Sequence, residues 1–221
     1  MLDIFLKRRT QRAFTNDVVM QEHIDSILSA GCSAPSKQRA YPWRVIALTQ
    51  SDSAIELKNN LFLDSFINTP IHKHLLTAQA PLLLAWIGIS ILDNFDLGIK
   101  SNDINMRDQG ISARSNDPQI QYNVRARAEK DTMIAASFAM IQAESLGYCT
   151  AFTSCFITES AHKILNLADN EWPIVFLSIG MPDNTLEKAE VIKDSAVIGF
   201  SDPRSFPEPK KLTPVELSTI I

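Results

Sequence analysis

The most apolar segment of the chain, residues 81–92, limits the folds that the sequence can adopt. Most of its side chains are hydrophobic, but a helix needs about 20 consecutive apolar residues to cross a bilayer. A short apolar run of this kind is consistent with a strand that is buried on both faces. The segment therefore predicts the interior of a sheet rather than a membrane span.

Predicted helices and strands alternate along the rest of the chain. The sequence predicts helices near residues 3–8, 21–32, 52–66 and 159–166, a long helix ending near Gly147, and strands at 44–49, 82–90, 150–154 and 173–180. No repeat, low-complexity tract or linker divides the chain. This pattern favours one domain, residues 1–221, folded as an α+β sandwich with helices flanking a mixed central sheet.

Two segments are too polar to belong to the core. Residues 93–130 are rich in Asp, Asn, Ser and Arg, and we expect either a mobile lid or a surface excursion there, because long polar loops are functional or disordered. After Pro182 the chain is punctuated by prolines, which predicts an extended C-terminal arm over about residues 183–221.

Composition argues against several classes of function. The formal net charge is −4, so no global field draws the chain to nucleic acid or to an anionic membrane. The three cysteines form no CxxC pair, so we expect neither a disulfide scaffold nor a metal site. Neither the glycine-rich dinucleotide fingerprint nor the P-loop motif is present. The N-terminus has no hydrophobic signal region, which predicts a cytoplasmic protein.

A local cluster of positive charge stands near the N-terminus. Arg8, Arg9 and Arg12 surround the hydroxyl of Thr10. Guanidinium groups bind phosphate and the polar edges of planar rings through forked hydrogen bonds. A solvated helix end also favours cations, so the cluster alone leaves that interpretation open. Together with the loop that follows, it favours an anion site.

This loop comes after the helix predicted at residues 21–32. Pro35 breaks that helix, and the chain continues through Ser36, Lys37 and Tyr41-Pro42-Trp43 into the next strand. A polar loop directly before a strand is a usual place for a ligand. The sequence therefore predicts a binding site in this loop.

The two segments resemble the nitroreductase family of flavin mononucleotide (FMN) enzymes, whose pattern reads roughly Arg-Arg-Ser-x-Arg and then Ala-Pro-Ser. Asp131–Ser137, leading to Leu146–Thr150, is similar to the family's central helix and the turn that closes it. Residues 164–167 and 172–182 resemble its penultimate helix and its last core strand. The resemblance covers nearly the whole chain in the correct order.

The resemblance assigns both segments to the cofactor. Arg8 and Arg12 would bind the phosphate and the ring edge, while Arg9 and Thr10 would add backbone or hydroxyl contacts. The Pro35–Lys37 loop would meet the pyrimidine half of the flavin ring, where a positive group would stabilise the reduced, anionic flavin.

Two later segments complete the implied site. Phe152, Thr153 and Ser154 would lie along the flavin near its reactive N5 atom. In the family, the C-terminal arm embraces the partner subunit of a homodimer and brings a basic pair near the flavin phosphate. Lys210 and Lys211 stand at that place.

The sequence departs from the family pattern at four positions. Lys37 and Arg39 replace small or amide residues, Tyr41 stands where glutamine is frequent, and Cys155 stands where glycine is common. No histidine base lies near Cys155 in the sequence, and hydride transfer needs none. We therefore assign no catalytic side chain, because flavin N5 would carry the hydride.

The function implied by the resemblance is an FMN-dependent oxidoreductase that passes hydride from NADH or NADPH to a nitroaromatic, a quinone or a similar acceptor. Three alternatives stay open. A related flavin reaction such as reductive dehalogenation is one, because a fold does not fix function. A flavin-holding or regulatory protein with little turnover is the second, and a phosphate-binding module without flavin is the third.

Overall fold

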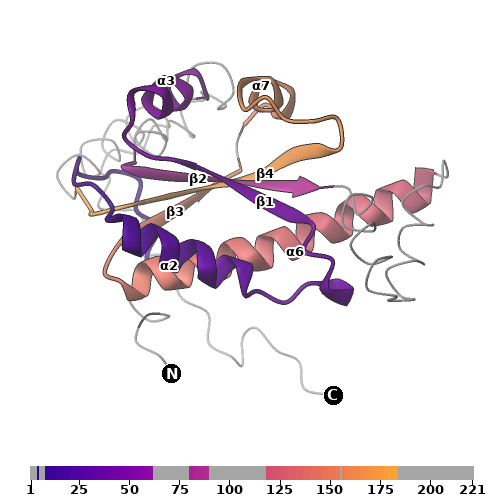
Figure 1. Cartoon of the computed structure of the whole chain (residues 1–221), viewed down its shortest axis with the longest axis horizontal. Helices are drawn as coiled ribbons and strands as arrows, with labels where there is room; N and C mark the ends of the chain where they lie inside the picture. The colour runs from indigo at the N-terminus through magenta and orange to yellow at the C-terminus, as the bar shows by residue number, and fades with distance from the viewer. Residues whose placement is uncertain (1–3, 5–7, 62–79, 90–117, 155, 184–221) are drawn as a thin grey trace, which may run out of the picture.

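The computed structural model describes residues 4, 8–61, 80–89, 118–154 and 156–183. In this part of the chain, a four-stranded sheet lies between two layers of helix (Figure 1). Helices α2 (Gln21–Cys32) and α6 (Pro118–Ser145) cover one face, and α3 (Asp52–Asn60) and α7 (Thr158–Ile164) cover the other. The predicted α+β sandwich is confirmed. The C-terminal arm, with Lys210 and Lys211, lies outside the described residues.

The strands are β1 (Trp43–Leu48), β2 (Leu82–Ile89), β3 (Cys149–Thr153) and β4 (Glu171–Gly180), and their order in the sheet is β1-β2-β4-β3. The three ladders between these strands are antiparallel. An isolated bridge between Thr10 and Thr150 is parallel. Among the described residues, the mixed character predicted for the sheet is limited to this bridge.

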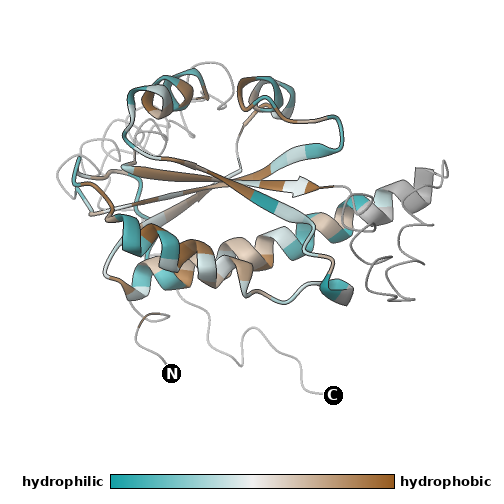
Figure 2. Ribbon diagram, in the orientation of Figure 1, coloured by the Kyte–Doolittle hydropathy of each residue, from teal (hydrophilic) through white to brown (hydrophobic). Residues whose placement is uncertain are grey.

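Strand β2 forms the centre of the core, as its apolar sequence predicts. Residues 82–88 are buried, and the largest side chain among them, Trp86, is fully buried between the sheet and the helices. Helix α2 approaches so closely that a Cβ atom on Gly31 would lie 2.5 Å from Cη2 of Trp86. Figure 2 shows a largely hydrophobic sheet between helices that carry both polar and hydrophobic residues.

Helix α6 packs its small residues against this core. Ala135, Ala136, Ala139 and Ala143 are fully buried, and they recur at spacings of three and four residues, the period of one helix face. Short side chains allow the helix to lie close to the sheet. The buried alanines therefore fix one face of the longest described helix on the sheet and leave its other faces open to other groups.

The start of α6 corrects one prediction. Residues 118–130 were predicted to belong to a polar lid or excursion, but they form the first half of the helix. Pro118 suits the first helical turn, because the missing N–H of proline would have no intrahelical partner there. The remainder of the predicted polar segment, residues 93–117, lies outside the described residues.

The other predicted boundaries agree closely with the structure where it is described. Helix α2 has the predicted bounds, and the ends of β1 to β4 and α7 lie within two residues of the predicted ones. Of the helix predicted near residues 3–8, only Ile4 and Arg8 are described, and the Arg8 N–H donates to the Ile4 carbonyl at 2.9 Å. No helix in the described part of the chain is long and apolar enough to span a membrane.

Candidate functional site

The basic N-terminal segment runs beside β3, at one edge of the sheet. The Gln11 N–H donates to the Thr150 carbonyl at 2.9 Å, and the Thr15 N–H donates to the Met181 carbonyl at 2.9 Å. Thr10 and Arg12 are exposed, and Arg8 is half-buried. These main-chain bonds fix the position of the segment, so its guanidinium groups stand at a defined place on the surface.

Glu144, in the last turn of α6, lies beside this cluster. The Thr150 hydroxyl donates to Oε1 of Glu144 at 2.5 Å. Burial raises the pKa of the Glu144 carboxyl, while the Thr150 hydrogen bond and the positive charge of Arg8 act in the opposite direction. Arg8 and the half-buried Glu144 carboxyl therefore lie close enough to interact electrostatically.

The sequence analysis assigned Glu144 no role, although one signal for it was present. The carbonyl end of a helix dipole disfavours a carboxylate, so an acidic side chain in the last turn of α6 indicates a compensating partner. Here those partners are Thr150 and Arg8.

The second predicted segment lies at the opposite edge of the sheet, just before β1. A 3₁₀ turn, Lys37–Arg39, follows Ser36. The Lys37 N–H donates to Oδ2 of Asp131 at 3.0 Å, and the Ser36 hydroxyl accepts from the Tyr41 N–H at 3.0 Å. Asp131 is only 8% exposed, so a buried carboxylate on α6 holds the loop in place.

The backbone of this loop is strained at two of the positions that depart from the family pattern. Arg39 has a φ of 55° and Tyr41 a φ of 44°. Side chains other than glycine rarely adopt the left-handed region, which costs about 1–3 kcal/mol per residue. Strain of this kind persists only where the surroundings hold the backbone, and the hydrogen bonds to Asp131 and Ser36 provide two of those restraints.

The third predicted segment lies at the end of β3. Phe152 is half-buried against the core between the sheet and α2 and α6. Thr153 is buried, and its hydroxyl has no hydrogen-bond partner among the described residues. Ser154 is exposed. A ligand beside this segment could therefore meet the Ser154 side chain and the main chain of Thr153, while Cys155 lies outside the described residues.

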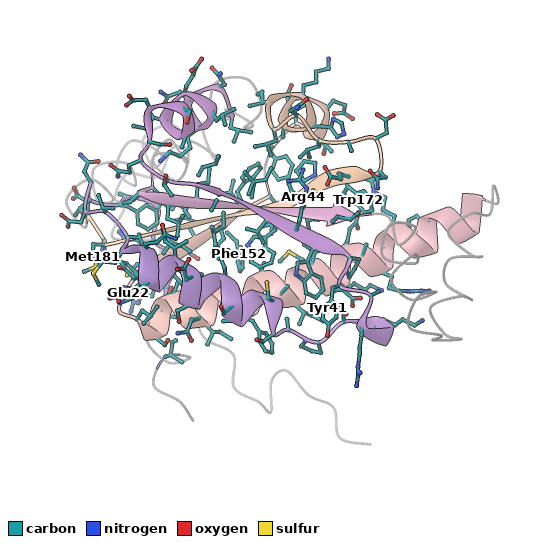
Figure 3. The ribbon with its side chains drawn as sticks, in the orientation of Figure 1. Glu22, Tyr41, Arg44, Phe152, Trp172 and Met181 are labelled. Carbon is teal, nitrogen blue, oxygen red and sulfur yellow. The ribbon has the colours of Figure 1, made fainter. Side chains whose placement is uncertain are left out.

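The structure does not bring all the predicted residues together within one chain. The N-terminal segment and Phe152–Ser154 share the β3 edge, whereas the Pro35–Lys37 loop belongs to the β1 edge. In Figure 3, Met181, which bonds to the N-terminal segment, lies at the left side of the molecule, and Tyr41, in the loop, lies right of centre below the sheet. We call the N-terminal segment together with Phe152–Ser154 the phosphate-side half. We call the Pro35–Lys37 loop the loop half.

Comparisons with known proteins give a family and a fold. The model of the nitroreductase family matches residues 5–181. No curated protein sequence matches the chain. A solved nitroreductase family protein from Streptococcus pneumoniae TIGR4 superposes with a TM-score of 0.70 at 14% identity, over 99% of this chain and 98% of that one.

Two further solved structures carry more specific names. An FMN-dependent nitroreductase from Clostridium difficile R20291 gives a TM-score of 0.55 at 20% identity, over 83% of this chain and 88% of that one. CLA-ER, an enone reductase of gut-bacterial fatty acid saturation, gives 0.65 at 14% identity, over 82% and 88%. At these identities the structural similarity establishes the fold, which is the nitroreductase-like fold predicted from the sequence.

Proposed function

The chain belongs to the nitroreductase family, and from this premise we propose that it is an FMN-dependent oxidoreductase whose sites are shared between the two chains of a homodimer. FMN would supply a ring whose N5 atom exchanges hydride with NADH or NADPH and with an acceptor such as a nitroaromatic or a quinone. The observation that carries the proposal is the placement of an exposed arginine cluster on the same sheet edge as Ser154.

The phosphate-side half has the chemistry that FMN requires. Arg12 and Thr10 are exposed beside the start of β3, and guanidinium groups form charge-assisted hydrogen bonds with phosphate. Arg8 is half-buried at the same place, near enough for its positive charge to act on the Glu144 carboxyl. We therefore assign Arg8, Arg9, Thr10 and Arg12 to the phosphate and the adjoining ring edge, as the family pattern implies.

The ring would lie along the end of β3. Strand β3 is antiparallel to β4. It runs away from the N-terminal arginines, so Thr153 and the exposed Ser154 lie at its far end. At about 3.3 Å per residue, Ser154 stands about 13 Å along the strand from Thr150, and Thr150 pairs with Thr10. In the proposed site, the phosphate would therefore lie at one end of the strand and the reactive ring edge at the other.

The loop half and the N-terminal arginine cluster lie far apart within one chain. Crossing from β1 to β3 takes three strand spacings, which is about 14 Å, and the N-terminal segment lies outside β3. Along α6, Asp131 and Glu144 are 13 residues apart, which is about 20 Å.

A second copy of the chain would bring a loop half next to a phosphate-side half. In a two-fold dimer, the loop half of one protomer would face the phosphate-side half of the other, because a two-fold operation exchanges the two positions. Pro35, Ser36 and Lys37 would then meet the pyrimidine half of the ring bound by the partner. Lys210 and Lys211, on the C-terminal arm, would approach the flavin phosphate.

Helix α6 exposes an apolar surface that fits this dimer. Ile134 is 40% exposed and Phe138 is 41% exposed, and the two side chains lie one turn apart on the same helix face. Tyr41, in the loop half, is another exposed large apolar residue. Clustered exposed apolar side chains mark interaction surfaces, and this surface lies between the two halves of the proposed site along α6.

The purified protein provides the test. We expect a yellow preparation with about one FMN per chain, and we expect NADH or NADPH to bleach it without oxygen. Steady-state rates with a nitroaromatic acceptor should give parallel double-reciprocal lines, because donor and acceptor would use one flavin surface in turn. A denatured extract without FMN would refute the proposal. If neither nucleotide reduces bound flavin, the protein holds flavin without nicotinamide-linked turnover.

A further inference from the structure

A cavity of about 330 Å³ lies beside Ser154, at the corner of the sheet beyond the end of β3. Strand β3 pairs with β4 only as far as Thr153 and Phe176, so residues 171–175 of β4 extend beyond it. Pro173 lies in this extension, where a residue without an N–H is tolerated. The first half of α6 covers the same corner and closes the cavity from one side.

Polar groups in the cavity have unused hydrogen-bonding capacity. Nε of Arg125 donates to Oε1 of Glu129 at 3.2 Å. The two terminal nitrogens of Arg125 and Oε2 of Glu129 make no further hydrogen bond among the described residues, and the side chains are 56% and 44% exposed, so a ligand would replace water at these atoms. Ser154 adds an exposed hydroxyl to the same lining. The cavity therefore offers strong donors and a strong acceptor side by side.

The walls of the cavity suit a flat ring. The guanidinium carbon of Arg125 lies 5.1 Å from the centre of the Trp172 ring, and Met133 and Phe156 supply further apolar surface. Trp172 is seated on the sheet at Gly88, where an added Cβ would lie 3.0 Å from its ring. In Figure 3, Trp172 lies beside Arg44 at the end of the sheet away from Met181.

The charge balance selects the class of ligand. Arg125 and Glu129 carry opposite charges and cancel, so an anion would gain little from the pair and would meet the Glu129 carboxylate. A neutral ring whose edge carries both a donor and an acceptor would satisfy both side chains at once. Purine bases have such an edge, and they stack on aromatic side chains and on guanidinium planes.

We propose that this cavity binds a purine base, and that it holds the adenine end of the nicotinamide donor. The second part rests on the proposed function. The chain has no dinucleotide fingerprint, so another structure must hold the donor. Ser154 lines the cavity and also belongs to the segment proposed to lie along flavin N5. Adenine in the cavity would leave the nicotinamide end of the donor close to the ring.

The test compares NADH with reduced nicotinamide mononucleotide, which lacks the adenine end. In anaerobic stopped-flow reduction, Arg125→Ala should raise the apparent Kd for NADH about tenfold, and Glu129→Gln should raise it severalfold. The apparent Kd for the mononucleotide should stay within twofold of the wild type in both variants. Lys130→Ala removes an exposed cation from the same helix outside the cavity, and it should leave both values unchanged. Equal effects on both donors, or none, would overturn the adenine assignment.

A binding measurement separates this inference from the proposed function. Adenosine should quench tryptophan fluorescence in the wild-type protein and in Lys130→Ala with the same Kd. In Arg125→Ala, the Kd for adenosine should be at least tenfold higher. If nicotinamide nucleotides fail to reduce the protein but adenosine binds in this way, the purine site stands and the proposed function falls. If benzoate binds through Arg125 and adenosine does not, the cavity is an anion site and the purine inference is wrong.

Discussion

Asp131 offers the most informative single substitution in the candidate site. Its buried carboxylate accepts the Lys37 N–H at 3.0 Å, and it anchors the loop that would reach the partner's flavin. Asp131→Ala removes the acceptor and leaves that N–H without its carboxylate partner. A hydrogen bond to a charged group contributes about 1.5–3 kcal/mol.

The loss should appear in flavin affinity. If the loop must be ordered to bind the ring, the same free energy weakens FMN binding by about 10- to 100-fold, because about 1.4 kcal/mol corresponds to a factor of ten. Asp131→Asn keeps an acceptor oxygen without the charge, so its loss should be smaller, at most about tenfold. FMN fluorescence quenching, titrated on the deflavinated protein, measures both.

The matched control and the melting temperature show whether Asp131 acts on flavin binding or only on the stability of the fold. Lys130→Ala changes the neighbouring, exposed residue of the same helix, and it should bind FMN like the wild type. An apoprotein of Asp131→Ala that melts early but binds FMN with wild-type affinity would refute the reasoning. In that case the carboxylate stabilises the fold, and the loop is not part of the flavin site.

Arg44 and Glu171 form an ion pair in which Nη2 of Arg44 donates to Oε2 of Glu171 at 2.7 Å. Three further substitutions test the core, this ion pair and the phosphate-side half. Gly31→Ala should cost about 1–3 kcal/mol of unfolding free energy in urea, because the new Cβ would lie 2.5 Å from Trp86. Arg44 lowers the pKa of Glu171 below its ordinary value of 4.5 through a hydrogen bond and its charge. The stability that Glu171→Gln removes should therefore be fully present above pH 4.5 and vanish as the pH falls through the lower, folded-state pKa. Arg12→Ala should weaken FMN binding by about 10- to 100-fold in the same quenching titration if Arg12 meets the phosphate.

The parts of the fold that follow from local pattern could be predicted. Strand β2 is apolar throughout, and α2 ends shortly before Pro35, so periodicity and one helix breaker suffice. The first half of α6 could not be recognised, because residues 118–130 are rich in polar and charged side chains, like the segment before them. Tertiary contacts such as the stacking of Arg125 on Trp172 support it instead.

In the candidate site too, local sequence patterns predict the segments but not their arrangement in space. Sequence motifs could identify the arginine cluster and the Pro35–Lys37 loop, but not their positions at opposite edges of the sheet. The hydrogen bond from Lys37 to Asp131 joins residues 94 positions apart, and no local pattern reports such a pair. The need for a second chain becomes visible only when the sheet order is known.

Mixed dimers test the shared site most directly. An Arg12→Ala chain and an Asp131→Ala chain can be coexpressed, each with its own affinity tag. Purification on both tags in turn then isolates the mixed dimer. If each flavin lies between the N-terminal cluster of one chain and the loop of its partner, one site carries both lesions and the other carries none. The account predicts one FMN of wild-type affinity per mixed dimer, although neither parent homodimer has such a site. A mixed dimer in which no site reaches wild-type affinity would contradict it, because each site would then be built within a single chain.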